Sequence, residues 1–475
     1  MKTTVTGLLC FALIATAVGA QPMDGDLVVS NFRDPTGVVG NYGPGSILSI
    51  DKVSGLIFTI TPRFTTVGTV NVGPNWIEMA TDNTNFMVPS LPTGTSATVA
   101  GNGLYLHYVD TAGKILRTLV VDTTPPTTTG NYINTIELDH DGTWLLAGGN
   151  SLWSFNEDTF TYSTLWTNAT LAGQHNAFVI DRAPGGPTYV VGKFNLTSST
   201  LPFMMGCDRS GLVTTIAAGN GGPSYISGLK IDRVTGDYIS TGFGTTASGG
   251  GGEYMRTTKA GVLTTLNFPS TATTMYRANG IYIDKEHLAW ILTYDWQTTP
   301  IPTVTNNYVP AVYKMDLQGV LLTMYIYSST ITRGLFAASG ITEYGCRHVV
   351  CKGSGQPGTS VTVKFSSRKI TDANKTYQLA ASLGYTNGLK MPNGEYLDLF
   401  FDNLFLVTAK NVFPSIFKKF GGILDGNGEA TATVNIPANI PPKLGIPIFV
   451  SGIVINPKAP GGISTVANTH WFVLD

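Results

Sequence analysis

The sequence predicts an all-β protein: a six-bladed β-propeller followed by a small β-sandwich domain. Two observations support this fold class. A hairpin turn recurs along the chain, and helical periodicity is absent between its copies. In each copy an Asp or equivalent is followed by Gly and then by alternating apolar residues and Thr, which is typical of a hairpin turn and a half-buried strand. The copies begin at Asp51, Asp110, Asn156, Asp208, Thr258 and Asp316.

A second element precedes each of these turns. It is a short apolar strand that ends in an acidic or turn residue and is followed by another strand. The first strands lie at 76–82, 135–139, 177–181, 228–232 and 280–284, and the second at 85–88, 143–147, 188–192, 237–241 and 287–292. Together with the hairpin this makes four short strands in roughly fifty residues, which is the period of propeller blades.

The two ends of this repeat region are expected to share one blade. Segment 24–30 begins at a second strand, whereas segment 335–344 has the pattern of a first strand with no blade after it. Pairing the two would close the ring and remove its exposed sheet edges. The count is then six blades within residues 21–351; an irregular insert at 89–103 leaves seven open.

Two stretches carry a resemblance to a known family. The run Gly-Asp-Leu-Val-Val-Ser-Asn-Phe from Gly25, and then Gly45 to Gly55, resemble the blade signature of NHL-type and related six-bladed propellers. The resemblance extends over about two thirds of the chain and implies a fold, but little about activity.

Beyond a linker at 352–358 the rhythm changes to longer strands, and residues 359–475 are expected to form the β-sandwich domain. Strands are expected at 359–366, 376–382, 395–407, 429–436, 446–455 and 470–474. Asp425 to Gly428 predicts a tight hairpin. The pattern that runs from Phe417 through this hairpin to Pro437 resembles a C-terminal module of exported planctomycete and myxobacterial proteins.

The N-terminus has the features of a secretory signal peptide, residues 1–20. Lys2 supplies a positive charge, residues 5–18 are mostly apolar, and small residues precede an expected cleavage after Ala20. The mature protein is therefore expected to be secreted, on the cell surface or periplasmic. An uncleaved anchor is the alternative, but the apolar stretch is too short to span a bilayer. No transmembrane segment is expected in the mature chain.

Composition and cysteines limit the partners further. The formal net charge is −1 and only 12% of residues are charged, which argues against a nucleic-acid partner. In an oxidising compartment Cys346 and Cys351 are expected to form a disulfide, with Cys207 left as a buried apolar residue. A zinc site that includes His348 is the alternative, but a second ligand pair is missing around Cys207.

The first strands of the blades share a small polar residue near their start. The residues are Asn75, Asn134, Asn176, Ser227, Asn279 and Ser339. Since inner strands line the channel of a propeller, this ring could bind a ligand at the channel mouth, with Gln174, His175 and Arg277 on its rim. The alternative is structural, because Asn and Ser also cap strand ends by bonding to the backbone.

The leading functional prediction is a binding or interaction module for a protein, peptide or glycan, without catalysis. The alternative is a divalent-metal-dependent lactonase- or hydrolase-like, or lyase-like, propeller enzyme; a structural extracellular component is the third possibility. Lactonase-like propellers imply a Ca²⁺ ion held by Glu, Asn and Asp in the channel, but here the carboxylate is missing from the ring and Glu343 is the nearest candidate. Lyase-like propellers imply a His, for which His175 is the candidate.

Overall fold

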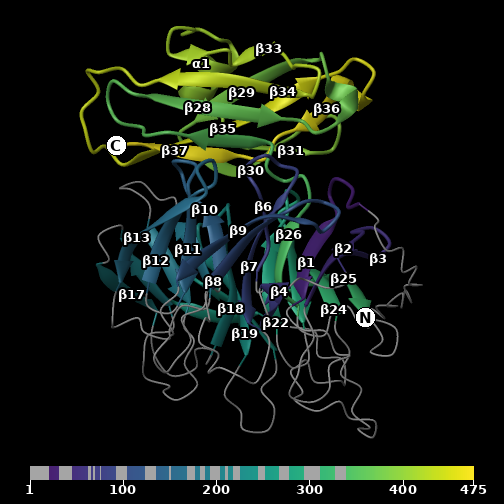
Figure 1. Ribbon diagram of the computed structural model, residues 1–475. Coiled ribbons are helices and arrows are strands. Elements are labelled where there is room, and N and C mark those ends of the chain that lie inside the picture. The colour runs from purple at the N-terminus through teal and green to yellow at the C-terminus, as the bar shows by residue number, and fades with distance from the viewer. Residues whose placement is uncertain are drawn as a thin grey trace, which may run out of the picture.

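The structure is a computed structural model. It describes residues 21–31, 45–61, 66–67, 70–74, 76–92, 104–122, 135–148, 151–167, 177–181, 188–192, 204–208, 212–217, 225–243, 252–266, 278–293, 311–326 and 338–475. In these ranges the chain forms six antiparallel sheets around a common axis, and further sheets that lie across one end of them (Figure 1). The six-bladed propeller followed by a β-sandwich is confirmed.

Blade 1 joins the two ends of the repeat region, as predicted. Its strand order is β26-β1-β2-β3, and Val29 of β1 lies opposite Ile341 of β26. This pairing gives β1 a partner on each side, so the ring closes without an exposed inner edge. The strands are β1 (Leu27–Asn31), β2 (Ser46–Ile50), β3 (Ile57–Thr61) and β26 (Ala338–Glu343).

Blade 2 has an irregular inner edge. Two short strands, β5 and β6, pair with different parts of the long β7, and β7-β8-β9 complete the sheet. The inner edge of this blade is therefore broken, and the described ranges form six blades; residues 93–103 of the predicted insert lie outside these ranges. The strands are β4 (Thr66–Val67), β5 (Val70–Pro74), β6 (Glu78–Met79), β7 (Phe86–Pro92), β8 (Leu104–Val109) and β9 (Ile115–Asp122).

Blades 3 to 6 are regular four-stranded sheets whose strands pair in chain order. Blade 3 has β10 (Thr135–Leu138), β11 (Trp144–Gly148), β12 (Ser151–Asn156) and β13 (Thr161–Thr167). Blade 4 has β14 (Ala177–Asp181), β15 (Thr188–Gly192), β16 (Met204–Cys207) and β17 (Val213–Ala217). Blade 5 has β18 (Tyr225–Ile231), β19 (Tyr238–Phe243), β20 (Gly252–Thr257) and β21 (Leu263–Leu266). Blade 6 has β22 (Ala278–Ile283), β23 (Ala289–Thr293), β24 (Ala311–Met315) and β25 (Leu321–Ile326).

The C-terminal domain packs two sheets face to face. One has the order β27-β28-β34-β32 and the other β33-β29-β35-β36, with β37 also paired to β35. Their inner faces share one apolar core that includes Val363, Phe365, Leu379 and Val450, as a sandwich requires. The elements are β27 (Val349–Lys352), β28 (Ser360–Ser366), β29 (Thr376–Ser382), β30 (Tyr385–Lys390), β31 (Tyr396–Leu399), β32 (Phe417–Lys418), β33 (Gly421–Ile423), β34 (Glu429–Asn435), β35 (Ile446–Ile455), β36 (Ile463–Val466) and β37 (His470–Leu474), with short 3-10 turns η2 (Ile370–Asp372) and η3 (Pro460–Gly462).

The region expected as a strand at 395–407 differs. The strand β31 ends at Leu399, and helix α1 (Asn403–Ala409) follows. Asp402 begins the helix because its side chain accepts a hydrogen bond from the backbone N–H of Phe405 at 2.8 Å, which is the ordinary role of Asp at an N-cap. The apolar run in the sequence gives no sign of this change, whereas the Asp before it does.

The predicted disulfide between Cys346 and Cys351 is wrong, because the structure has both thiols free. Cys346 packs against the propeller core between blades 1 and 2, whereas Cys351 is fully buried in the sandwich core, on β27. Because β27 begins at Val349 and pairs with β28, it turns Cys351 into a different core. The third cysteine, Cys207, is fully buried among apolar residues.

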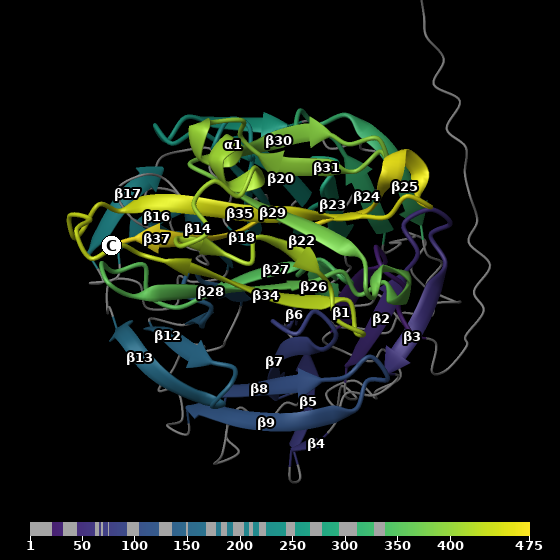
Figure 2. The same cartoon turned by 90° about the horizontal axis from the view of Figure 1, so that it is seen from above.

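The sandwich covers one end of the propeller channel (Figures 1 and 2). One apolar cluster runs through the contact: it includes Leu145 of blade 3 and Phe178 of blade 4 together with Phe449 and Trp471 of the sandwich. Because the turns after the inner strands contact the sandwich, each inner strand ends at this face and begins at the opposite end. The ring centroid of His140, in the turn after β10, lies 5.2 Å from that of Trp471.

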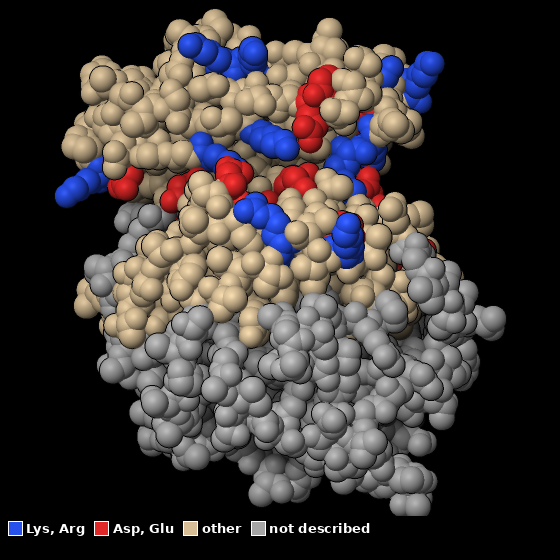
Figure 3. Space-filling view, in the orientation of Figure 1, with Lys and Arg blue, Asp and Glu red and all other residues tan. Residues whose placement is uncertain are grey.

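Charged side chains gather along this contact, as Figure 3 shows. Arg233 pairs with Asp398 at 2.6 Å. Lys285 pairs with Glu395 at 3.5 Å and donates to the carbonyl oxygen of Val466. The two domains are thus joined by both an apolar core and ion pairs at its edge. In the described ranges no helix has the length and apolar character needed to cross a membrane.

A glycine substitution tests the closeness of this contact. Gly142, in the turn after β10, has φ +83°, and a Cβ there would lie 2.9 Å from the carbonyl oxygen of Cys351. Gly394 has a similar φ of +89° but open space around it. Both Gly→Ala variants carry the strain of a left-handed backbone, about 1–2 kcal/mol. We expect Gly142→Ala to cost about 1–3 kcal/mol more, the cost of overpacking, as measured by urea unfolding; equal losses would contradict the contact.

Candidate functional site

Most of the residues predicted at the channel mouth lie outside the described ranges. These are Asn75, Asn134, Gln174, His175, Asn176 and Arg277, and the side chain of Ser339. Ser227 is buried, and its hydroxyl donates to the carbonyl oxygens of Ala278 at 2.5 Å and Thr241 at 3.3 Å. The backbone oxygen of half-buried Asn279 accepts from Thr241. Ser227 thus links blade 5 to blade 6, and the predicted ligand ring stays a prediction.

A second set of equivalent positions lies nearer the sandwich end of the inner strands. Its members stand two residues before the turn that follows each inner strand: Glu78, Glu137, Val179, Lys230, Tyr282 and Thr342. Three of them carry a charge. Lys230 of blade 5 lies 3.6 Å from Glu78 of blade 2 and 3.3 Å from Glu137 of blade 3. Because blades 2 and 5 face each other across a ring of six, the Lys230 side chain crosses the channel.

Further donors complete this network around Glu78. Arg347, in the connection from β26 to β27, lies 3.3 Å from Oε2 of Glu78. The hydroxyl of Thr342 donates to the same oxygen at 3.3 Å, and the indole of Trp76 to Oε1 at 3.4 Å. We call Glu78, Glu137, Lys230, Thr342 and Arg347 the channel network. It spans the channel just below the sandwich with hydrogen-bonded charges.

Burial and ion pairing shift the pKa values of Glu78 and Lys230 in this network. Desolvation raises the pKa of the Glu78 carboxyl, and Lys230 and Arg347 oppose that shift. For Lys230, burial alone would lower the pKa, but Glu137 and Glu78 more than offset it and the pKa is raised. The charge of Lys230 is therefore kept in the channel by its two carboxylate partners, since an unpaired ion in this environment would be neutralised instead.

The carboxylate that the sequence offered for a metal, Glu343, also has a cationic partner. Lys52, in the turn after β2, is hydrogen-bonded to Glu343 and lies 3.8 Å from Asp284. Its ammonium lies 5.6 Å from the centre of the Trp290 ring. Within the described ranges no three His, Cys, Asp or Glu side chains gather as a metal site would need. The Ca²⁺ ion remains a prediction that rests on Asn134, Asn176 and Asn279.

The Asn and Ser residues at the strand starts stand out in the sequence, whereas the channel network was not predicted. The signal was present: counting back two residues from each turn, instead of five, gives the second set of positions. In strands 135–139 and 228–232 an ionisable residue interrupts an apolar run, which is unusual for a buried strand. Arg347 gives no such signal, because the connection that carries it has no repeat to compare it with.

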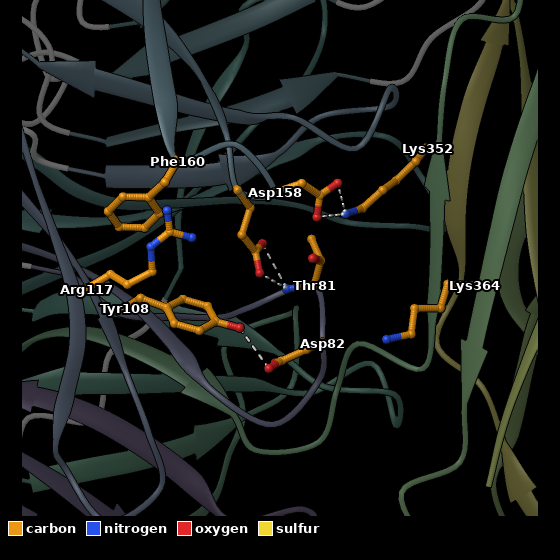
Figure 4. A pocket seen from close by; sticks show the side chains of 9 residues that line it. Thr81, Asp82, Tyr108, Arg117, Asp158, Phe160, Lys352 and Lys364 are labelled. Atoms are coloured by element: carbon orange, nitrogen blue, oxygen red, sulfur yellow. Dashed lines mark hydrogen bonds and ion pairs between the residues drawn. The ribbon is translucent and has the colours of Figure 1, made fainter. Parts of the chain in front are cut away.

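A pocket opens where blades 2 and 3 meet the sandwich. Its volume is about 360 Å³, and its walls are Thr81, Asp82, Tyr108, Arg117, Glu157, Asp158, Phe160, Lys352 and Lys364. We call it the junction pocket (Figure 4). The propeller supplies Arg117 and the aromatic rings, and the sandwich supplies both lysines. The guanidinium of Arg117 stacks on the ring of Phe160 at 4.0 Å.

Comparisons with known proteins give solved structures of low similarity and no matching family. No family model and no curated protein matches the chain. Among solved structures, a gluconolactonase from Xanthomonas campestris has 13% identity and a TM-score of 0.34, over 59% of this chain and 90% of that chain. A GH74 xyloglucanase from the same organism has 14% identity and a TM-score of 0.40, over 74% of this chain and 59% of that chain. Similarities this low do not transfer an activity.

Proposed function

We propose that the protein is a binding module whose ligand, a protein, peptide or glycan, contacts the propeller end that faces away from the sandwich. The position of the sandwich carries this proposal. It occupies the end where the inner strands finish, through the cluster that joins Phe178 to Trp471. The strand starts, where the sequence places its polar ring, are at the other end. Concave sites with a few convergent polar groups are the usual binding sites of such folds.

The channel network supports a single open mouth. Because Lys230 reaches Glu78 across the axis, a ligand could not pass along the channel to the sandwich. Binding would then depend on the rim residues alone, for which His175 and Arg277 are the candidates from the sequence. Secretion after cleavage at Ala20 belongs to the same proposal, and an exported protein that begins at Gln21 is the expected product.

The enzyme alternative makes different demands. A divalent-metal hydrolase needs carboxylates free to coordinate the ion, and in the described part of the channel Glu78, Glu137 and Glu343 each have a Lys or Arg partner. These ion pairs favour the binding module over the enzyme for the sandwich end of the channel. At the strand starts, at the other end of the channel, metal analysis would decide between the binding module and the enzyme.

The test uses the mature protein on glycan and peptide arrays, followed by His175→Ala and Arg277→Ala variants. We expect each substitution to weaken binding of the selected ligand about tenfold or more, as loss of a charged hydrogen bond would. Lys314→Ala, on the outer part of blade 6, is the control and should bind as the wild type does. Unchanged binding by both rim variants would refute the site. A stoichiometric divalent ion with turnover of lactones that a chelator abolishes would establish the enzyme instead.

A further inference from the structure

The junction pocket has three cationic side chains around one cavity. Arg117 stands on the propeller side, on β9, and Lys352 and Lys364 stand on the sandwich side, on β27 and β28. Figure 4 shows them on opposite walls with the cavity between them. Arg117 is exposed, while Lys352 and Lys364 are 29% and 36% exposed. An anionic group that enters the pocket can therefore meet a charge on either wall.

The carboxylates of the pocket differ in how many hydrogen bonds they accept from the protein. Asp82 accepts hydrogen bonds from the N–H groups of Thr84 and Asn85 and from the hydroxyl of Tyr108, at 2.8 to 2.9 Å. Glu157 is buried and accepts from the N–H of Thr81 and the indole of Trp144. Both belong to the walls of the pocket.

Asp158 is different, because it is 70% exposed and its described partner is Lys352 at 2.8 Å. Lys364 has only a loose pair with Glu429 at 3.5 Å, with both side chains about one-third exposed. Such surface pairs contribute little to stability and can be replaced by a ligand at low cost. Three groups are thus open to a ligand: Arg117 and Lys364 as donors and Asp158 as an acceptor.

The charges of the pocket decide which ligand fits. Three cations face three carboxylates, so the pocket has no net formal charge. A multiply charged anion would meet Asp82, Glu157 and Asp158 at close range. A single carboxylate can bind in the fork of the Arg117 guanidinium, and hydroxyl groups can donate to Asp158. The volume lies at the small end of the range for ligand pockets, roughly 300–1,000 Å³.

We propose that the junction pocket binds a monocarboxylate that carries several hydroxyl groups. Among sugars, the simplest such ligand is a single uronic acid. Its carboxylate lies between Arg117 and Lys364, and its hydroxyls donate to Asp158. Because the two cations belong to different domains, the bound acid links the propeller to the sandwich. This site is separate from the channel mouth and does not depend on the proposed function there.

Titration calorimetry of the full mature chain tests the proposal, with glucuronate as the ligand and glucose, sulfate and phosphate as comparisons. We expect glucuronate to bind more tightly than the other three. Arg117→Ala and Lys364→Ala should each weaken its binding about tenfold or more, as expected for a lost charged hydrogen bond. Lys418→Ala, at an exposed lysine on β32 of the same sheet, is the matched control and should change nothing.

Four results would overturn the proposal. Glucuronate that fails to bind the wild-type protein refutes the site. Glucose that binds as well refutes the role of the carboxylate, and sulfate or phosphate that binds as tightly shows attraction of any anion. Retained glucuronate binding in both Arg117→Ala and Lys364→Ala would place the ligand elsewhere, and the circular dichroism spectra of the variants verify that they fold. Arg277→Ala, which tests the channel mouth, should leave glucuronate binding unchanged.

Discussion

Replacing Lys230 with methionine should cost about 3–5 kcal/mol of folding free energy at neutral pH, the usual effect of breaking a buried ion pair from one side. The ammonium lies between Glu78 and Glu137, and its side chain is 17% exposed, against 7% and 11% for theirs. Without it two carboxylates from neighbouring blades share a confined space, and Arg347 still compensates Glu78. Urea unfolding of wild type and variant, followed by tryptophan fluorescence, measures the difference.

The pH dependence of this loss has a definite sign. Burial already raises the pKa of Glu78 above its usual value, against the opposing effect of Lys230. In Lys230→Met that pKa rises further, and a carboxyl with a raised pKa in the folded state loses stability as pH rises above its unfolded value. The variant should therefore be closest to wild type near pH 4.5 and fall behind as the pH approaches 8.

A half-buried lysine with an exposed partner is the matched control for this experiment. Lys314 pairs with Glu286 at 3.3 Å, and the Glu286 side chain is 62% exposed. Lys314→Met should cost no more than about 1 kcal/mol, with little dependence on pH. If Lys230→Met behaved like Lys314→Met, or if its loss were the same at pH 4.5 and pH 8, the charges of the channel network would not be energetically coupled as the distances indicate.

The propeller could be predicted because its blades repeat one local sequence pattern. The residues that form the turn with Asp and Gly lie within a few positions of one another, and Asp110 is an example. Its carboxylate accepts from the N–H groups of Ala112 and Lys114, and Gly113 takes the positive φ that closes the turn. The ring closure by β1 and β26 could be predicted for the same reason, since each segment has half of a pattern seen elsewhere in the chain.

The channel network and the junction pocket could not be predicted in this way, because neither is local. Lys230 and Glu78 are brought together only by the number of blades in the ring. Arg117 and Lys364 line one pocket only because the sandwich lies on blades 2 and 3. Similarly, Cys346 and Cys351 are close in sequence but are separated by the direction in which β27 leaves the propeller. Proximity along the chain is a poor guide where two cores begin within a few residues.

The ion pair between Arg233 and Asp398 makes the second strong prediction. Arg233 stands in the turn after β18 and Asp398 on β31, so the pair joins blade 5 to the sandwich at 2.6 Å. The Asp398 side chain is 2% exposed and that of Arg233 is 20% exposed. Asp398→Ala leaves the guanidinium without its partner at the edge of an apolar cluster, and we expect a loss of about 3–5 kcal/mol. Glu429→Ala, which breaks the exposed pair with Lys364, should cost about 1 kcal/mol at most.

The double variant Arg233→Met with Asp398→Leu tests whether the ion pair stabilises the protein on balance or only offsets the cost of burying its two charges. Burial raises the pKa of Asp398, and Arg233 counteracts this without removing it. The ionised carboxylate is therefore still costly to the folded state even with its partner present, as is common for buried pairs. Removing both charges at once should then cost less than either single substitution, measured as a coupling energy in a double-mutant cycle. Additive losses would mean that each side chain stabilises the contact independently. The charge pair itself would then contribute nothing to holding the two domains together.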